Sequence, residues 1–411
     1  MAEAVSIGSS SPFRKSGKGL AFSAIMGLAF CHLLNDAIQS LLPALYPLMK
    51  ETLHLSFSEI GIIGLVFQAT ASLIQPAVGL SFDRFPRVWP LPLAICTLAA
   101  GLVSLSLSQS YPAILFSAFA IGVASAIFHP EASRGARLLS GGRIGFAQSF
   151  FQFGGSLGSA CGPLLVAFLI VPYGQRAILL CLLPSILGFM IVARLSPEIH
   201  ARQVKNRPAA DRTRTGTMKR RHIAVAIATL TLLICTKNIY TSSMQNYYSF
   251  HLIEKFGLTI PQAQFALFVF LASVALGTLL GGLLTDSIGT RRMISFSILG
   301  TLPFSLMLPY AGLAATILLS VAVGLILSSA FSAIVVYGQE LLPDHVGLVS
   351  GLFFGLAFGF SGLAAAGLGF LADWIGLSPI MQVCGILPAV GLLSLYLPEL
   401  PSQRQSPLGP A

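Results

Sequence analysis

An imidazole and a carboxyl group lie four residues apart inside an otherwise apolar stretch of this sequence. His32 and Asp36 belong to a run, from about 20 to 49, in which almost every other side chain is hydrocarbon. This i, i+4 spacing places both side chains on one face of a helix, and Asn35 and Gln39 widen that face. A carboxyl group at membrane depth is costly and tends to face a bundle interior or a water-filled cavity. If the run spans a bilayer, this face predicts a site for protons or for a polar substrate.

The composition indicates that the solvent of this chain is lipid. Of its 411 residues, 55% are hydrophobic and 9% are charged, whereas a soluble domain usually carries about 25% charged residues. Stretches of roughly 20 apolar residues, the length that a bilayer requires, recur along the chain. We place twelve of them at 20–49, 57–80, 89–108, 112–130, 145–171, 176–195, 223–252, 262–284, 293–310, 313–337, 347–371 and 378–397. The sequence therefore predicts an all-α polytopic membrane protein with twelve transmembrane helices.

Lysine and arginine are distributed very unevenly about these twelve stretches. Of 24 such residues, 20 fall in segments that the topology puts on one side. The opposite side carries Lys50, Arg176 and Lys255, and Lys237 lies within the seventh stretch. The positive-inside rule then predicts that both termini lie in the cytoplasm. The net charge of +10 is thereby explained as an orientation signal, and no nucleic-acid partner is expected.

Motifs of covalent or metal chemistry are not found in the sequence. The six cysteines all lie in apolar stretches without a C-x-x-C pair, so neither a disulfide framework nor a metal site is expected. There is no G-x-x-x-x-G-K-[ST] phosphate loop and no H-E-x-x-H motif. We therefore expect neither an enzyme nor a bound cofactor, and we do not expect ATP to be the energy source.

A polar, basic segment divides the chain into two related halves. The run that begins at Gly79 closes the second stretch, and a similar run from Gly282 closes the eighth, 203 positions later. Two such halves are typical of transporters built from parallel repeats, with the substrate site near the midplane between them. The predicted parts are a cytoplasmic tail at 1–19, a six-helix bundle at 20–195, a cytoplasmic linker at 196–222, a second six-helix bundle at 223–397 and a cytoplasmic tail at 398–411.

The charged run at 79–87 resembles the loop signature of the major facilitator superfamily, although Pro86 replaces the usual glycine. The resemblance implies the major facilitator fold, with two pseudo-symmetric six-helix halves. Gly79 permits close helix approach, Asp83 can meet a helix N-terminus, and two arginines can bridge the halves. We predict a gate latch made by Gly79, Asp83, Arg84, Arg87, Arg134, Asp286, Arg291, Arg292 and Glu340. The alternative is that Arg84 and Arg87 only set the topology.

Small residues in the fifth stretch form a second motif. Gly158, Gly162 and Pro163 resemble the G-x-x-x-G-P motif of the antiporter branches of that superfamily. Its physical content is close helix packing and a bend at proline. Simple packing, without a role in antiport, is the alternative.

Several longer runs are similar to the fosmidomycin resistance protein family over nearly the whole chain. They lie at 32–36, 128–134, 140–143, 147–155, 255–258 and 339–343. The resemblance implies a bacterial inner-membrane exporter that exchanges protons for a drug.

A proton-driven antiporter needs a carboxyl or imidazole group at which protonation and substrate occupancy compete. Asp36, with His32 beside it, is the first candidate. Lys237 lies 201 positions later and is nearly repeat-equivalent to Asp36, so we predict that the two either pair directly or share a water-filled site. The alternatives are a static ion pair that fixes helix packing, and a neutral Asp36 that hydrogen-bonds His32 or Asn35.

Glu131 is the second candidate for proton coupling. Arg134 follows it at i+3, a spacing that equally suits a plain ion pair at a helix end. His129 can titrate near neutral pH, or it can be a hydrogen-bonded histidine of the cavity.

The remaining polar side chains of these stretches suit a small polar or anionic ligand. The predicted substrate site consists of Lys237, Asn35, Gln39, His129, Gln148, Gln152, Asn238, Tyr240 and Gln245. The prediction is thus a monomeric drug:proton antiporter, driven by the proton gradient, for a small antibiotic such as fosmidomycin. The alternative is a proton symporter that takes up a small organic anion or phosphorylated metabolite.

Overall fold

The computed structural model describes residues 17–140, 144–205, 220–342 and 346–399, and the regular elements in these ranges are all helices. The first half contains α1 (Gly17–Gln39), α2 (Leu41–Ala44), α3 (Tyr46–Leu53), α4 (Phe57–Arg84), α5 (Pro90–Leu107), α6 (Tyr111–Leu138), α7 (Ile144–Leu165), η1 (Val166–Ile170), α8 (Val171–Tyr173), η2 (Gln175–Cys181) and α9 (Leu182–Lys205). The second half contains α10 (Arg220–Phe256), α11 (Ile260–Ile288), α12 (Thr290–Met307), η3 (Leu308–Tyr310), α13 (Leu313–Ser328), α14 (Ala330–Leu341), α15 (Val346–Ile375), α16 (Leu377–Ile386) and η5 (Leu387–Tyr396).

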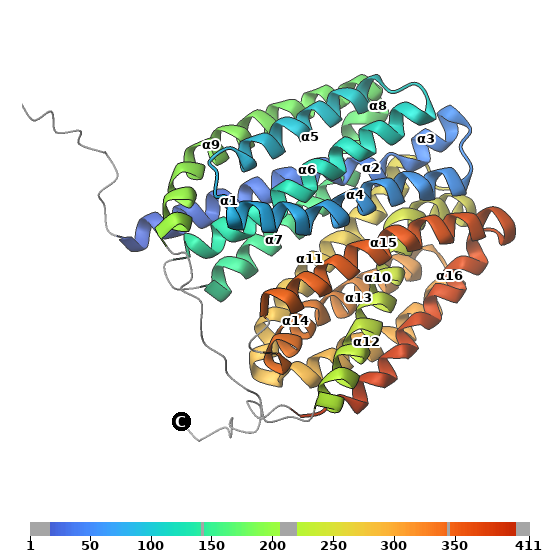
Figure 1. Cartoon of the computed structure of the whole chain (residues 1–411). Helices are drawn as coiled ribbons and strands as arrows, with labels where there is room; N and C mark the ends of the chain where they lie inside the picture. Colours follow the sequence, from blue (N-terminus) through green and yellow to red (C-terminus); the bar gives the residue numbers. More distant parts are fainter. Residues whose placement is uncertain (1–16, 141–143, 206–219, 343–345, 400–411) are drawn as a thin grey trace, which may run out of the picture.

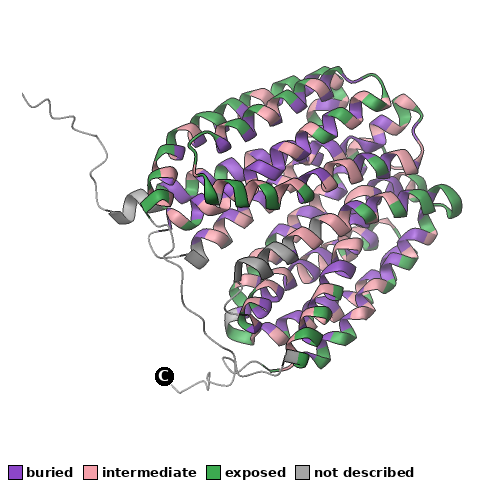
Figure 2. Cartoon of the chain, viewed as in Figure 1, coloured by how far each residue is buried: buried purple, intermediate pink, exposed green. Residues whose placement is uncertain are grey.

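The described helices are long and apolar enough to form a multi-pass membrane protein. Eleven helical segments meet the length and hydropathy that a bilayer crossing requires, and α15 contributes a shorter apolar stretch at Gly359–Ile375. Large apolar side chains, such as Leu183 and Phe296, are exposed on the outside of the bundles. Figure 2 shows buried residues inside each bundle and exposed ones on the outer helices. Such a surface is suited to lipid.

Several helix boundaries differ from those predicted. The first apolar stretch is interrupted at Ser40 and Leu45 and continues as α2 and α3. The helix α9 runs on to Lys205, into the segment that was predicted as linker. An i, i+4 ion pair of 2.7 Å between Arg202 and Glu198 supports this extension, and the same arginine donates to the Leu138 carbonyl at 3.0 Å. Tertiary contacts therefore lengthen a helix whose sequence reads as polar.

The two halves meet along two helix pairs, α4 with α15 and α7 with α11. At the start of α4 the contact is tight, since a Cβ on Gly369 would lie 2.3 Å from the Phe57 carbonyl oxygen. Further along, a Cβ on Gly362 would lie 2.9 Å from the Cβ of Gln68, whereas one on Gly79 would meet nothing within 4 Å. The helices α4 and α15 therefore diverge towards the end where α4 finishes.

The clusters of buried apolar side chains also show where the two halves are joined and where they are separate. The cluster that includes Tyr46 and Tyr247 draws on both halves. A cluster around Phe128 belongs to the first half alone, and a cluster around Tyr337 belongs to the second. In Figure 1 the two bundles come together near α3 and α16 and separate towards the start of α1 and the end of α9. The molecule is joined at one end and divided at the other.

Candidate functional site

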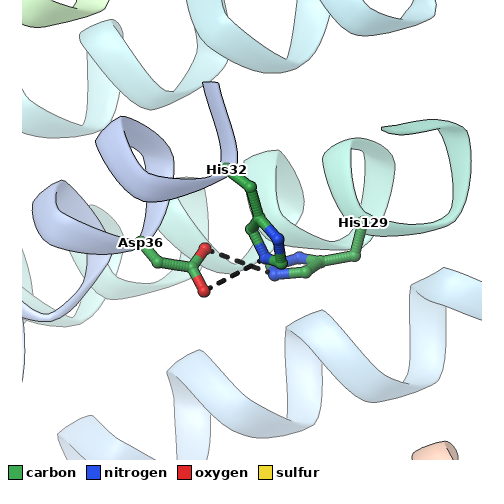
Figure 3. A group of neighbouring side chains, drawn as sticks. All are labelled: His32, Asp36 and His129. Carbon is green, nitrogen blue, oxygen red and sulfur yellow. Dashed lines mark ion pairs between the residues drawn. The ribbon is translucent and has the colours of Figure 1, made fainter. Parts of the chain in front are cut away.

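Two histidines from different helices point at one carboxylate in the first half. His32 Nε2 lies 3.3 Å from Asp36 Oδ2, and His129 Nε2 lies 3.3 Å from Asp36 Oδ1. Figure 3 shows both rings turned towards the carboxylate, one from α1 and one from α6. The shared face of α1 that the i, i+4 spacing predicted is therefore present. The second partner of Asp36 is His129 on α6, which the spacing within α1 did not specify. We call His32, Asp36 and His129 the histidine–aspartate cluster.

The outer nitrogens of the two rings fix the tautomers. His32 Nδ1 lies 2.7 Å from the Phe151 carbonyl oxygen, and His129 Nδ1 lies 2.9 Å from that of Ser125. A carbonyl oxygen only accepts, so each Nδ1 is assigned as the N–H donor. In a neutral ring, Nε2 then turns a lone pair towards Asp36. Three acceptors converge in the cluster, which favours a proton or another cation between them.

Further contacts hold the cluster in place. Asn35 Nδ2 donates to Asp36 Oδ1 at 2.9 Å. The Phe151 ring stacks on the ring of His32, with centroids 4.0 Å apart. His32 is only 3% exposed, whereas the side chains of Asp36 and His129 are 15% and 18% exposed. The cluster is therefore closed on the His32 side and accessible on the His129 side.

Glycines of α7 make room for this face of α1. A Cβ on Gly158 would lie 2.2 Å from the Leu33 carbonyl oxygen, and one on Gly162 would lie 2.1 Å from Ser40 Oγ. A Cβ on Gly155 would lie 2.4 Å from the His32 ring and 2.9 Å from Asp36 Oδ2. The glycines thus bring α1 and α7 into backbone contact. The role of Gly155 was not predicted, because a glycine pair in a membrane helix does not show which neighbour it faces.

The second predicted proton carrier, Glu131, is buried and forms an ion pair with Arg134. The other terminal nitrogen of that guanidinium donates to the Gly79 carbonyl at 3.3 Å. These contacts tie α6 to the end of α4 within the first half. The ion pair of Glu131 with Arg134 is the alternative to proton coupling that the i, i+3 spacing allowed.

Lys237 is buried on α10, 8% exposed, with its Nζ 5.4 Å from the ring centroid of Phe331. In the described part of the chain, no ion pair joins it to Asp36, which is held by the histidines instead. The direct pairing that we considered is therefore absent from this structure, and the shared site stays a prediction.

The other predicted substrate residues occupy several environments. Gln148 exchanges hydrogen bonds with Ser133 at 2.8 and 3.1 Å, and Asn238 donates to the Ile234 carbonyl at 2.8 Å. Asn35, Gln39 and Tyr240 are buried, while Gln152 and Gln245 are half-buried. Within the described residues, Asn35 Oδ1 and Gln39 Nε2 have no hydrogen-bond partner. Both atoms are buried, so two polar atoms near the cluster are unsatisfied in this state.

The predicted gate residues lie at the end where the halves separate. Arg291 donates to the Leu395 carbonyl at 2.8 Å and pairs with Glu399 at 3.4 Å, both within the second half. Exposed side chains are those of Arg84, Arg87, Arg292 and Glu340. The side chains of Asp83 and Asp286 lie outside the described residues.

A contact between the halves that was not predicted lies at the opposite end. Asp373 of α15 accepts from the backbone N–H groups of Phe57 and Ser58, each at 2.8 Å, and from Ser58 Oγ at 2.5 Å. The carboxylate thereby caps the N-terminus of α4, where negative charge is stabilised. Within the second half, Tyr247 on α10 donates its hydroxyl to the Ala365 carbonyl of α15. We call the contact of Asp373 with Phe57 and Ser58 the Asp373 clasp; its only sequence signal is a carboxyl group at the end of an apolar stretch.

A comparison with family models identifies this architecture. The model of the major facilitator superfamily matches residues 28–251 and 238–410. The chain belongs to the major facilitator superfamily. It is a membrane transporter and not an enzyme. The match confirms the predicted fold class and the predicted resemblance to this superfamily.

Relatives of this major facilitator are also informative. The chain is 46% identical over 379 residues to the fosmidomycin resistance protein of Escherichia coli K12, covering 92% of this chain and 93% of that protein. It is 37% identical to the uncharacterized MFS-type transporter YfnC of Bacillus subtilis 168, covering 90% and 92%.

Solved structures share the fold. A bacterial homologue of the human lysosomal transporter Spinster, in an inward-facing and occupied conformation, matches with a TM-score of 0.72 at 15% identity, covering 92% of this chain and 97% of that one. The nucleoside transporter NupG matches with a TM-score of 0.68 at 14% identity, covering 92% and 100%.

Proposed function

We propose that this transporter is a drug:proton antiporter that exports a small polar or anionic antibiotic, such as fosmidomycin, across the bacterial inner membrane. The proton gradient supplies the energy, both termini lie in the cytoplasm, and the chain acts as a monomer. The observation that carries the proposal is the histidine–aspartate cluster, in which the Nε2 atoms of His32 and His129 each lie 3.3 Å from an oxygen of the Asp36 carboxylate. The relative at 46% identity, a fosmidomycin resistance protein, supports the substrate class.

The cluster offers a physical basis for competition between proton and substrate. With a proton bound, one of its short contacts becomes a charge-assisted hydrogen bond. Without the proton, Nε2 of each histidine and the Asp36 carboxylate can accept hydrogen bonds from hydroxyl or N–H groups of a substrate. The same atoms serve either partner, so binding of one disfavours the other.

Lys237 is the proposed anchor for an anionic group of the substrate. Its ammonium is buried in the second half, against the Phe331 ring. A buried cation is best compensated by an anion, and an anionic substrate would provide one. A substrate held by Lys237 at one end and by the cluster at the other would touch both halves.

Alternating access supplies the remaining step. With the termini in the cytoplasm, the separated end of the molecule faces inward, and the Asp373 clasp closes the outer side. In the proposed cycle the clasp opens when the halves rock against each other. The predicted latch at Gly79 to Arg87 would then form on the inner side.

The experiment is drug uptake into everted membrane vesicles that carry an inside-acid proton gradient. An exporter accumulates the drug in these vesicles, and collapse of the gradient abolishes accumulation. Asp36→Asn, which cannot carry the proton, should also abolish it at an unchanged protein level. Accumulation that is unchanged in Asp36→Asn contradicts the proposed coupling site. Gradient-driven loss of drug from the vesicles would instead indicate the proton symporter.

A further inference from the structure

We propose that the histidine–aspartate cluster is also a binding site for one Zn²⁺ ion, held by His32 Nε2, His129 Nε2 and a carboxylate oxygen of Asp36. No metal site was expected from the sequence, because the cysteines lack the required pairing. This site uses no cysteine, and one of its ligands comes from a different helix. The inference goes beyond the proposed transport function and does not depend on it.

The spacing of the donor atoms suits this ion. Zinc lies about 2.0–2.1 Å from histidine nitrogen and about 2.0–2.2 Å from carboxylate oxygen, so two ligands of a tetrahedral site lie about 3.3–3.5 Å apart. His32 Nε2 lies 3.3 Å from Asp36 Oδ2, and His129 Nε2 lies 3.3 Å from Asp36 Oδ1, so each nitrogen is at this separation from one oxygen of the carboxylate. One donor atom from each of the three residues lies within 4.8 Å of the others. A side-chain rotation that brings one Asp36 oxygen to this separation from both nitrogens would place the three donors on one ion.

The groups behind the ligands are those of a metal site. A histidine that binds metal through one nitrogen usually donates its other N–H to a carbonyl or carboxylate, which fixes the ring. Here the Phe151 and Ser125 carbonyls receive the Nδ1 protons at 2.7 and 2.9 Å. Asn35 holds the carboxylate through a 2.9 Å hydrogen bond. The lone pairs of both Nε2 atoms are thereby directed inward before any ion arrives.

The surroundings hold the cluster tightly on one side and leave an entry path on the other. Gly155 packs directly against the His32 ring and Asp36, since a Cβ there would lie 2.4 Å from the ring and 2.9 Å from Asp36 Oδ2. The side chains of Asp36 and His129 are 15% and 18% exposed, so the cluster can be reached from the His129 side. Three protein ligands leave a fourth position for water, as in exchangeable zinc sites.

Zinc binding is measured with the purified full chain in detergent, carrying an affinity tag without histidines. Isothermal titration with ZnCl₂ should give one ion per chain, and CoCl₂ should give the visible absorption of tetrahedral cobalt. Replacing an outer residue of a metal site costs about 10–100-fold in affinity, so losing a ligand in His129→Gln or Asp36→Asn should cost at least about 100-fold. The control is His251→Gln, a histidine on α10 that is 1% exposed and lies outside the cluster.

Unchanged zinc affinity in both His129→Gln and Asp36→Asn, with gel filtration and thermal unfolding like the parent chain, overturns the proposal. An equal loss in His251→Gln also overturns it. The transport assay keeps the two proposals apart. Proton-driven export without zinc binding would refute this site alone, whereas zinc binding at the cluster without drug export would refute only the proposed function.

Discussion

The Asp373 clasp makes a quantitative prediction about the balance between the two states of the transporter. Asp373→Ala removes the three hydrogen bonds that this carboxylate accepts from the start of α4. Asp373 is exposed, so its contribution is that of a solvated cap rather than of a buried ion pair. Loss of a capping carboxylate costs about 0.5–2 kcal/mol. The substitution should destabilise the state in which the clasp is closed by that amount and leave the other state unchanged.

A change of about 1 kcal/mol corresponds to roughly a fivefold change in an equilibrium constant. We expect Asp373→Ala to shift the equilibrium towards the state in which the separated end is closed. The shift is measurable by double electron–electron resonance, as a change in the distance between spin labels at Leu80 on α4 and Leu283 on α11. These positions are 71% and 66% exposed and lie in different halves. The labels require replacement of the six cysteines.

The matched control for this measurement is Glu399→Ala, which removes an exposed carboxylate whose partner, Arg291, lies in the same half. It should leave the distance distribution unchanged. If the population of short label-to-label distances in Asp373→Ala equals that in the parent chain, the clasp does not set this equilibrium. The same conclusion follows if Glu399→Ala produces the same shift.

Three further substitutions test the packing and the charges of the site. Gly155→Ala places a methyl group 2.4 Å from the His32 ring, so it should lower stability by about 1–3 kcal/mol in thermal unfolding and abolish export. Gly367→Ala, with nothing within 4 Å of its Cβ, should do neither. Equal effects of the two substitutions would contradict the close packing of Gly155 against His32. Glu131→Gln breaks the ion pair with Arg134, so it should lower the unfolding temperature while the number of protons exchanged per drug molecule stays the same. A smaller number of protons exchanged per drug molecule, at unchanged stability, would make Glu131 a proton carrier. Lys237→Ala should raise the KM for an anionic substrate at least about tenfold, because a charge-assisted contact contributes about 1.5–3 kcal/mol, and an unaltered KM would exclude the lysine as an anchor.

The helices and one face of the site could be predicted from the sequence because both depend on local spacing. Apolar stretches of about 20 residues specify the spans, and the i, i+4 spacing of His32 and Asp36 specifies a shared face. The motif at 79–87 indicated the superfamily, which the family model confirms. These features need no knowledge of how helices cross.

The partners of Asp36 could not be predicted, because they depend on helix crossing. His129 is 93 positions away, counted from 36 to 129, and it reaches the carboxylate only because α1, α6 and α7 pack around one point. Lys237 was the more obvious counter-charge by repeat position, yet the repeat offset gives no distance between side chains. The Asp373 clasp depends in the same way on α15 lying against the start of α4.

The position of the cluster within one half has a consequence for the proposed cycle. His32, Asp36 and His129, with the carbonyls of Ser125 and Phe151, all belong to α1, α6 and α7 of the first half. Rocking of two rigid halves leaves the distances among these groups unchanged. Proton binding therefore does not by itself favour either state of the transporter, since a ligand shifts an equilibrium only through different affinities for its two states. A substrate that also contacts Lys237, in the other half, is sensitive to the rocking. In the proposed cycle the proton and the substrate thus compete at the cluster, and the substrate's contact with the second half links that competition to the movement.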